Sequence, residues 1–428
     1  MKIAIIGAGW SGLAAAVQAT RSGDQVTVFE ASRSLGGRAR ALAATLPDGE
    51  NVTLDNGQHI LIGAYQHTLA LMREVGVDPE AALLRLPLTL QFPDGGGLKL
   101  PALRAPWDAL LGIATARDWT LGDKLSLLLA AVRWQWRGFD CPAQWTVAQL
   151  CQSLNARVLQ ELVAPLCVSA LNTPPDRASA QMFLRVLRDS LFATPGGSNL
   201  LLPRVDLSAC FPEAAARWLT EHGACVLLGE RVPSLAALAS GWHVQGQAFD
   251  QVLLAAGARD AARLVEHSEP ALPAALQARL HGWRMTAQAL QFEAITTVYA
   301  HAPDATLAQP MLALRSDATH PAQFAFDRGQ LGGPAGLIAL VVSASVGERE
   351  LIESQVLAQA RAQLGLELRA CASITEKRAT FACTAGLRRP AMDLAPGLRA
   401  CGDYVQGPYP ATLEGAVRSA LNAVTSDP

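Results

Sequence analysis

The chain has 428 residues, half of them hydrophobic, with 35 basic and 37 acidic side chains. This length accommodates two or three domains around a large core, and the composition excludes a disordered protein. A net charge of −2 at pH 7 offers no overall attraction for nucleic acid, so no nucleic-acid partner is expected. The eight cysteines lack metal-ligand spacing, which predicts no metal site and reduced, buried thiols in a cytoplasmic protein.

The start of the chain predicts a dinucleotide site. The apolar run at residues 2–6 is typical of a buried strand, and an apolar helix follows at residues 13–19. Between them, Gly7 permits a tight turn, Gly9 lets a pyrophosphate approach the backbone, and Gly12 lets helix and strand pack closely. The helix N-terminus adds free N–H groups and a positive dipole end. The predicted pyrophosphate site consists of Gly7, Gly9, Trp10, Ser11 and Gly12.

A second strand, residues 25–29, ends in Glu30. It lies about 20 residues beyond the glycines, where a carboxylate can accept hydrogen bonds from both hydroxyls of an adenosine ribose. Gly36 and Gly37 then predict a second flexible turn with Arg38 directly behind it, and a guanidinium suits a phosphate oxygen. Glycines after a strand often form only a turn, but the full order of elements is specific to nucleotide binding.

The pattern from Glu30 to Arg38 resembles the FAD-binding opening of the amine oxidase, phytoene desaturase and protoporphyrinogen oxidase superfamily. The resemblance implies FAD rather than NAD. It implies an α/β fold with a Rossmann-type, glutathione-reductase-2-like FAD-binding domain and a discontinuous α+β substrate domain. It further implies that the backbone of Val232 lies against the adenine. It places Asp55 and His59 near the isoalloxazine, with a plain turn and a structural histidine as the alternative.

Changes in composition predict the domain boundaries. Residues 1–75, 205–282 and 371–428 follow the nucleotide-binding pattern and form the predicted FAD-binding domain. Residues 76–204 and 283–370 form the predicted substrate-binding domain. Leucine- and tryptophan-rich helices dominate its first segment, and alternating strands with one helix dominate its second.

Residues 101–139 predict two amphipathic helices. Their apolar faces comprise Leu103, Trp107, Leu110 and Leu111 on the first helix and Leu125, Leu128, Leu129, Val132 and Trp136 on the second. These faces either pack against the domain core or form a lipid-facing entrance, because tryptophans and arginines beside an apolar face suit a membrane interface. The second alternative places a cytoplasmic protein peripherally at the inner membrane.

The C-terminal segment carries a second nucleotide-site signal. A strand ends in Gly402 and Asp403, a loop follows, and a helix starts with Thr412 in its first turn. Asp403 is placed to bind ribityl or pyrophosphate-side hydroxyls. The helix N-terminus is expected to face the flavin edge where negative charge accumulates on reduction. Gly415 is expected to let the backbone approach the ring.

Four segments extend the resemblance over nearly the whole chain to one family, hydroxysqualene dehydroxylase, also called squalene-associated FAD-dependent desaturase. They are LDNGQHILIGAY, LNTPPDRASAQMFLRVLRDSLF, LLLPRVDLS and GPYPATLEGAVRSA. The resemblance implies reductive dehydroxylation of hydroxysqualene to squalene on the route to hopanoids, with hydride from reduced FAD quenching an allylic cation. It therefore implies a long-chain isoprenoid substrate and an electron donor that the sequence does not identify.

Departure of the hydroxyl requires an acid or hydrogen-bond donor in a site that excludes water. The candidates are Tyr404, Tyr409, His59 and Asp55.

Two alternatives share the predicted fold. A phytoene-type carotenoid desaturase or a flavin amine oxidase would take hydride, and Tyr404 with Tyr409 could form half of the aromatic cage typical of amine oxidases. A prenyl-binding protein similar to GDP-dissociation inhibitors and Rab escort proteins would bind no flavin. The intact Glu30, Arg38 and Asp403 argue against that non-enzymatic alternative.

Overall fold

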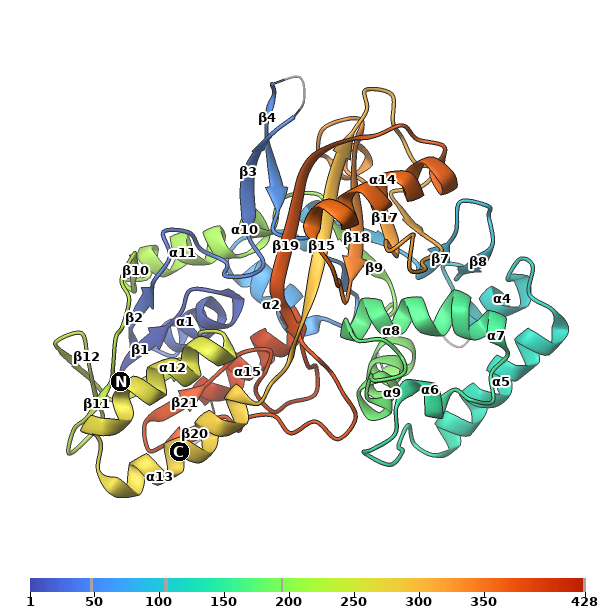
Figure 1. Ribbon diagram of the computed structural model, residues 1–428. Helices are drawn as coiled ribbons and strands as arrows, with labels where there is room; N and C mark the ends of the chain where they lie inside the picture. The colour runs from blue at the N-terminus through green and yellow to red at the C-terminus, as the bar shows by residue number, and fades with distance from the viewer. Residues whose placement is uncertain (47–48, 104–106, 194, 426–428) are drawn as a thin grey trace.

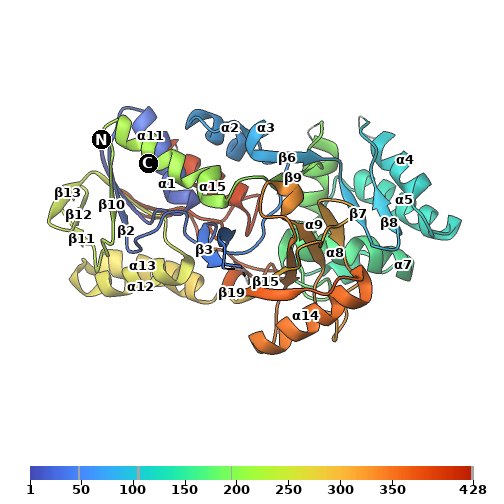
Figure 2. The ribbon, with the colours of Figure 1, turned by 90° about the horizontal axis from the view of Figure 1, so that it is seen from above.

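The computed structural model describes residues 1–46, 49–103, 107–193 and 195–425. Two large sheets organise the molecule, and a group of helices between residues 107 and 188 extends from one end (Figure 1). In both views this helical end lies opposite the chain termini (Figure 2).

A six-stranded sheet organises the nucleotide-binding half. Its order is β10-β2-β1-β14-β21-β20, in which the first five strands are parallel and β20 is antiparallel. The strands are β1 (Lys2–Ile6), β2 (Gln25–Glu30), β10 (Cys225–Leu228), β14 (Gln251–Leu254), β20 (Asp393–Ala395) and β21 (Leu398–Ala400). Because both faces of this sheet are covered, its central strands are almost continuously apolar. Three distant parts of the chain therefore build one sheet.

Helices cover both faces of this sheet (Figure 2). On one face lie α1 (Trp10–Arg21), α11 (Pro212–Glu221) and α15 (Leu413–Thr425), and on the other lie α12 (Ala258–Ser268) and α13 (Ala274–Gln288). Successive side chains of a strand point to opposite faces. Ile3 and Ile5 accordingly share an apolar cluster with α1 and α11, whereas Ala4 and Ile6 share one with α12. The arrangement is the predicted doubly covered Rossmann-type sheet.

A five-stranded antiparallel sheet forms the second half, in the order β16-β17-β18-β15-β19. Its strands are β15 (Phe292–His301), β16 (Met311–Ala313), β17 (Phe324–Asp327), β18 (Leu337–Ser343) and β19 (Arg369–Phe381). Helix α14 (Arg349–Leu364) covers its outer face, where Val298 and Ile338 share an apolar cluster with Val356.

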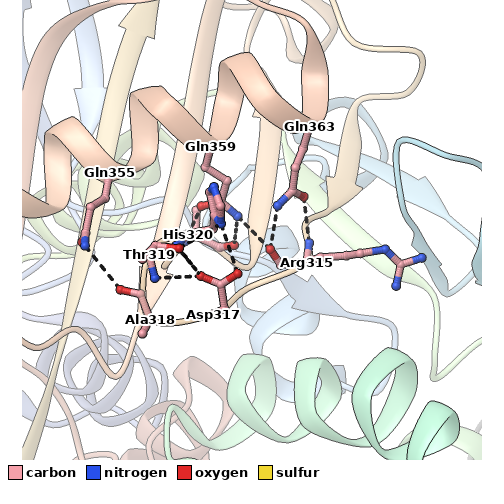
Figure 3. A network of polar contacts seen from close by, with 9 residues as sticks. Arg315, Asp317, Ala318, Thr319, His320, Gln355, Gln359 and Gln363 are labelled. Carbon is pink, nitrogen blue, oxygen red and sulfur yellow. Dashed lines mark hydrogen bonds and ion pairs between the residues drawn. The ribbon is translucent and has the colours of Figure 1, made fainter.

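Glutamines on α14 hold the loop that leads into β17 (Figure 3). The Gln359 amide donates to the carbonyls of Arg315 and Ala322, and its Oε1 accepts the N–H of Ala322 at 2.8 Å. Gln363 makes the same type of double contact with the backbone of Arg315. Each glutamine satisfies loop N–H and C=O groups at once, so this outer face is fixed and Phe324 is held toward the interior.

The helical end consists of α4 (Trp107–Thr115), α5 (Leu121–Trp136), α6 (Val147–Leu150), α7 (Ala156–Val158), α8 (Ala164–Leu171), α9 (Ala180–Arg188) and the π-helical turns η1 (Leu159–Val163) and η2 (Asp189–Ala193). A three-stranded sheet, β5-β9-β6, connects it to the remainder. The other elements are β3 (Ala41–Thr45), β4 (Asn51–Asp55), β5 (Leu61–Ile62), α2 (Gln66–Glu74), α3 (Pro79–Ala82), β6 (Leu83–Leu86), β7 (Thr89–Gln91), β8 (Gly97–Lys99), β9 (Leu200–Pro203), α10 (Leu207–Cys210), β11 (Ala236–Ala237), β12 (Trp242–Val244), β13 (Gln247–Phe249), η3 (Glu269–Ala271) and η4 (Gly329–Leu331).

Two predicted domain boundaries fall inside elements. The one after residue 282 lies within α13, and the one after residue 370 lies within β19. Helix α13 continues to Gln288, beyond the predicted boundary, and packs against β20. The division of the chain into two domains stays a prediction. Its boundaries after residues 282 and 370 have to lie at the ends of α13 and β19, because a boundary does not divide a helix or a strand.

Two surface expectations also change. Six cysteines are buried as predicted, but Cys225 is exposed and Cys371 is half-buried. For α4 and α5, the expectation that the apolar faces pack against the domain core is wrong for most of their residues. Trp107 is 66 % exposed and Trp136 is 90 % exposed. Leu128 is half-buried against the core. Within the described residues, no helix combines the length and apolar character needed to cross a membrane.

Candidate active site

A cavity of about 880 Å³ is lined by residues from both halves of the molecule. Most of the predicted cofactor residues line this cavity: Gly7, Gly9, Trp10, Ser11, Glu30, Gly36, Gly37, Arg38, Val232, Gly402, Asp403 and Thr412. Residues that are far apart in the sequence are therefore brought to one site.

The first glycine turn has the predicted packing roles. Gly7 has φ +114°, and a Cβ there would lie 2.9 Å from the carbonyl oxygen of Ala255. A Cβ on Gly12 would lie 1.8 Å from the carbonyl oxygen of Gly7, so only glycine lets α1 approach β1 this closely. Gly12 itself does not line the cavity. Gly9 lines it and has only the Cα of Gly37 within 4 Å of its Cβ position, which leaves its backbone open to a ligand.

The second glycine turn lies directly beside the first. The Gly36 N–H donates to the carbonyl of Ala8 at 2.9 Å, and Gly36 forms a parallel bridge with Gly9. Trp10 lies under this pair, because its indole N–H donates to the Ala39 carbonyl at 3.0 Å. The two turns form a wall of bare backbone beside the N-terminus of α1, a surface suited to a phosphate group.

Glu30 is held rigidly at the end of β2. One carboxylate oxygen accepts the N–H of Ala8 and the other accepts the N–H of Ser32, both at 2.7 Å. Each oxygen keeps a second lone pair, since a carboxylate offers about four acceptor positions. The side chain lines the cavity and can still accept ribose hydroxyls.

Arg38 and Asp403, predicted as separate cofactor ligands, bind each other. Arg38 Nη2 lies 2.6 Å from Asp403 Oδ1, and Nη1 donates to the carbonyl of Ala379 on β19 at 2.7 Å. The Asp403 carboxylate raises the pKa of Arg38 further above its usual value. The guanidinium therefore joins the two halves of the molecule, and a phosphate would compete with Asp403 for its charge.

His59 lines the cavity but does not suit the role of acid. Its Nδ1 lies 2.8 Å from the carbonyl oxygen of Gly57, and a carbonyl only accepts, so we assign the proton to Nδ1. Burial lowers the pKa of His59, which favours the neutral ring. Its Nε2 is then an acceptor, not a donor.

Asp55 lies outside the cavity lining, contrary to the expectation of a place near the flavin. Its Oδ1 accepts the N–H of Leu207 at 2.8 Å, at the first residue of α10, and its carbonyl accepts the hydroxyl of Tyr299. Burial raises the pKa of Asp55 to about 6. The residue holds β4, α10 and β15 together, which is a structural role.

The two loop tyrosines occupy different places. Tyr404 is 2 % exposed, lines the cavity, and its hydroxyl has no hydrogen-bond partner among the described residues. Burial raises the pKa of Tyr404 well above 10, so the phenol remains protonated. Tyr409 is absent from this lining, and the Arg418 guanidinium lies 4.8 Å from its ring centroid. Burial and the nearby Asp189 carboxylate raise the pKa of Tyr409. The two rings do not form an aromatic cage in one cavity.

A smaller apolar cavity of about 100 Å³ adjoins the first, and we call it the distal arm. Six residues line both: Ile60, Tyr65, Ser169, Ala170, Phe324 and Thr412. The remaining lining is mostly aliphatic, and its polar exceptions are Asp189, Ser190, Ser198 and Tyr409. Tyr65 was not predicted as a site residue; it reaches this position because β5 pairs with β9 far along the chain, a pairing that no local pattern indicates.

The N-terminus of α15 faces the cavity through Thr412, Leu413 and Ala416. The Thr412 hydroxyl accepts the N–H of Gly415 at 3.0 Å and donates to the Tyr409 carbonyl, so it caps the helix. Gly415 does not line the cavity. A Cβ there would lie 1.8 Å from the Tyr409 carbonyl oxygen, so this glycine accommodates the preceding loop. Its approach to the flavin ring stays a prediction.

The site therefore offers two helix N-termini, two backbone-lined glycine turns and a fixed carboxylate around one cavity. A family model described as flavin containing amine oxidoreductase matches residues 10–426. The chain belongs to the flavin containing amine oxidoreductase family. This confirms the predicted fold class and a flavin-dependent oxidoreductase, and the buried donors and bare backbone fit a flavin nucleotide.

Full-length relatives confirm the predicted resemblance. Proteins named hydroxysqualene dehydroxylase from Sinorhizobium fredii and Rhodopseudomonas palustris are 28% and 29% identical, each covering 98% of this chain and 96% of its own length. The crystal structure of an oxidoreductase from Methanosarcina mazei is similar over 100% of both chains, with a TM-score of 0.74 and 16% identity. That structural likeness establishes the fold.

Proposed function

We propose that the chain uses FAD to convert hydroxysqualene reductively to squalene. The observation that carries the proposal is the distal arm, an apolar extension that begins at the flavin cavity and can take one end of a hydrocarbon chain. The two full-length relatives named hydroxysqualene dehydroxylase support the same substrate class.

FAD, as opposed to a flavin without adenosine, is favoured by the extent of the lining. Glu30 and Val232 lie in the same cavity as Asp403 and the α15 N-terminus. We propose that Glu30 binds the adenosine ribose, that the backbone of Val232 contacts the adenine, and that Gly9 and Ser11 bind the pyrophosphate. Arg38 and Asp403 would act together near the ribityl chain.

When bound in reduced form, the flavin supplies the hydride that replaces the hydroxyl group. Of the four predicted donors, Tyr404 suits departure of the oxygen best, because its hydroxyl is buried, protonated and unpaired among the described residues. Its high pKa makes it a hydrogen-bond donor and a weak acid, so we propose that it stabilises the departing hydroxide, which leaves as water after taking a solvent proton.

Exclusion of water is the second task of the chain. Phe324 and Phe326 on β17, with Ile295 on β15, present an apolar wall to the cavity. An allylic cation there would meet hydride before solvent. Because squalene precursors partition into lipid, we also propose that the protein works in the cytoplasm at the inner membrane surface, on the route to hopanoids, with an external donor that reduces the flavin.

The second candidate is a carotenoid-type desaturase, which would use the same apolar arm with hydride moving in the opposite direction. Amine oxidation is less favoured, since Tyr404 and Tyr409 line different cavities.

One anaerobic experiment tests cofactor, substrate and direction together. The bound flavin is photoreduced, hydroxysqualene is added, and flavin absorbance and squalene are both followed. We expect one flavin to be oxidised for each squalene formed. Oxidation of the flavin without formation of squalene would contradict the proposal. Reduction of the oxidised flavin when hydroxysqualene is added would contradict it too, and would favour the desaturase.

A further inference from the structure

Helices α4 and α5 expose a dense group of large apolar side chains, which we call the α4–α5 face. It consists of Trp107, Leu110, Leu111, Leu121, Leu125, Leu129, Val132 and Trp136, all more than 40 % exposed. Elsewhere in the described chain, large exposed apolar side chains are scattered singly, for example Leu228 and Val346. Scattered residues need no explanation, but eight exposed large apolar residues on two successive helices indicate an interaction site.

Helix α5 is apolar on two opposite sides. Its buried side carries Leu127, Ala130 and Trp134, at helical spacing, against the core. Its exposed apolar residues recur at intervals of three and four over the same turns, so they form one continuous stripe. The capping box of Thr120 and Asp123 fixes the start of the helix. The exposed stripe is therefore not a frayed end, and a partner outside the chain is needed to cover it.

Basic side chains lie at the C-terminal end of this stripe, although α4 carries Asp108 and the turn after α5 carries Asp140. Arg133 and Arg137 are exposed on either side of Trp136, and neither forms an ion pair with a described residue. Asp123, the only acid within α5, is buried and bonded to Thr120. Tryptophan beside arginine is typical of the headgroup layer, where the indole is half-immersed and the guanidinium meets phosphate. The surface is thus complementary to an anionic lipid.

The face also leads to the proposed substrate site. Phe139, three residues after α5, packs against Phe192 with ring centroids 5.1 Å apart. Phe192 is 42 % exposed, and its neighbour Leu191 lines the distal arm. The contact between Phe139 and Phe192 therefore connects the end of α5 with η2, the π-helical turn whose residues line the distal arm.

We propose that the α4–α5 face docks on a bilayer containing anionic phospholipid and brings the distal arm to the membrane surface. The inference rests on the proposed function, because a lipid-dissolved isoprenoid gives the docking its purpose. Both views place α4 and α5 at the end of the molecule away from the chain termini (Figures 1 and 2).

The test measures binding of the flavin-loaded enzyme to vesicles by flotation. Vesicles contain either phosphatidylcholine alone or phosphatidylcholine with phosphatidylglycerol. Leu121→Asp is compared with Val346→Asp, since the two side chains are 86 % and 88 % exposed but only Leu121 belongs to the face. We expect at least a tenfold lower partition coefficient for Leu121→Asp and an unchanged one for Val346→Asp. The double change Arg133→Ala and Arg137→Ala should remove the preference for the anionic vesicles.

Other outcomes overturn the inference. Wild-type enzyme that stays unbound, or equal binding by Leu121→Asp, would show that lipid does not cover the face. A dimer dissociated by Leu121→Asp, without vesicle binding, would assign the face to a second copy. A different result would contradict the proposed function alone. If the enzyme binds vesicles but converts hydroxysqualene neither in vesicles nor in detergent, the docking proposal stands and the proposed substrate is wrong. Leu121→Asp should convert the detergent-dispersed substrate at the wild-type rate.

Discussion

Helices α1 and α5 have similarly apolar sequences but opposite surroundings. Nine of the 12 residues of α1 are buried, because the six-stranded sheet, α11 and α15 enclose it. Only four of the 16 residues of α5 are buried, and its outer stripe meets no part of the described chain. An apolar pattern thus predicts that a helix will be covered, but the identity of the cover depends on elements far away in the sequence or outside the chain.

The sharpest contrast between the two helices is at their glycines. Gly12→Ala in α1 should displace the helix from β1, since the new Cβ would overlap the Gly7 carbonyl oxygen at 1.8 Å. We expect a loss of about 3 kcal/mol in unfolding free energy together with loss of bound flavin. Gly122→Ala in α5 is the matched control, because its Cβ would lie 3.5 Å from the nearest atom, the Asn155 amide nitrogen. It should be neutral or stabilise by up to about 1 kcal/mol.

Thermal melts and flavin content per chain check both variants. Equal flavin content in the two proteins would show that the close approach of α1 to β1 does not support the cofactor site.

Burial in the nucleotide-binding half also predicts a pH dependence. The Asp55 carboxyl keeps its proton up to about pH 6 in the folded protein, whereas in the unfolded chain it releases it near its ordinary pKa of 3.8. The folded state therefore binds more protons between these values, and stability falls as pH rises through that window. The contribution is at most about 3 kcal/mol, fully present below pH 4 and lost above pH 6.

Asp55→Asn keeps an acceptor for Leu207 and removes the titration. Denaturant unfolding from pH 4 to pH 7 should give wild type and variant curves that diverge with rising pH, with the variant more stable at pH 7. Parallel curves would mean that Asp55 titrates normally.

Tyr404→Phe separates chemistry from packing within the cavity. It removes the hydroxyl that has no partner among the described residues and preserves the ring, which lies edge-on to Trp283 at 6.5 Å between centroids. We expect the rate of single-turnover dehydroxylation to fall about hundredfold, while stability and flavin content stay unchanged or rise slightly. In contrast, Tyr409→Phe changes a residue outside this cavity and should have little effect on the rate. An unchanged rate in Tyr404→Phe would remove this residue from the proposed chemistry.

Glu30→Ala tests the adenosine end of the same cavity. The variant loses a carboxylate that two backbone N–H groups orient, so FAD should bind about tenfold to hundredfold more weakly. Titration of the flavin-free protein, followed by flavin fluorescence, measures the change. Glu221→Ala, an exposed residue at the end of α11, should bind FAD as wild type does. Equal affinities in both variants would contradict the ribose assignment.

The comparison also explains which parts of the site the sequence could predict. The glycine turns, Glu30 and Asp403 follow from local order, because strand, turn and helix create the nucleotide site within a few dozen residues. The Arg38–Asp403 pair was not predictable, since it joins positions 365 residues apart. The misplacement of Asp55 has the same cause: a turn after a strand looks alike whether it lines a cavity or binds the first residue of α10.

The fate of the leucine-rich helices could not be predicted for a related reason. Both sides of α5 carry apolar residues at helical spacing, so the pattern does not distinguish the side that packs on the core from the side that faces outward. Which side is buried depends on the direction in which the helix starts at its N-cap, Thr120. That direction is determined by tertiary structure.

The smallest expected effect is therefore also the most informative about the outer stripe. Leu129 in α5 is 57 % exposed, whereas Leu13 in α1 is fully buried. Leu129→Asp should change the unfolding free energy by no more than about 0.5 kcal/mol in the absence of lipid, because an exposed side chain loses little burial. Leu13→Asp places an unpaired charge among the helices over the sheet and should prevent folding. A large destabilisation of Leu129→Asp would mean that the stripe is covered within the protein itself, and the contrast between the two helices would disappear.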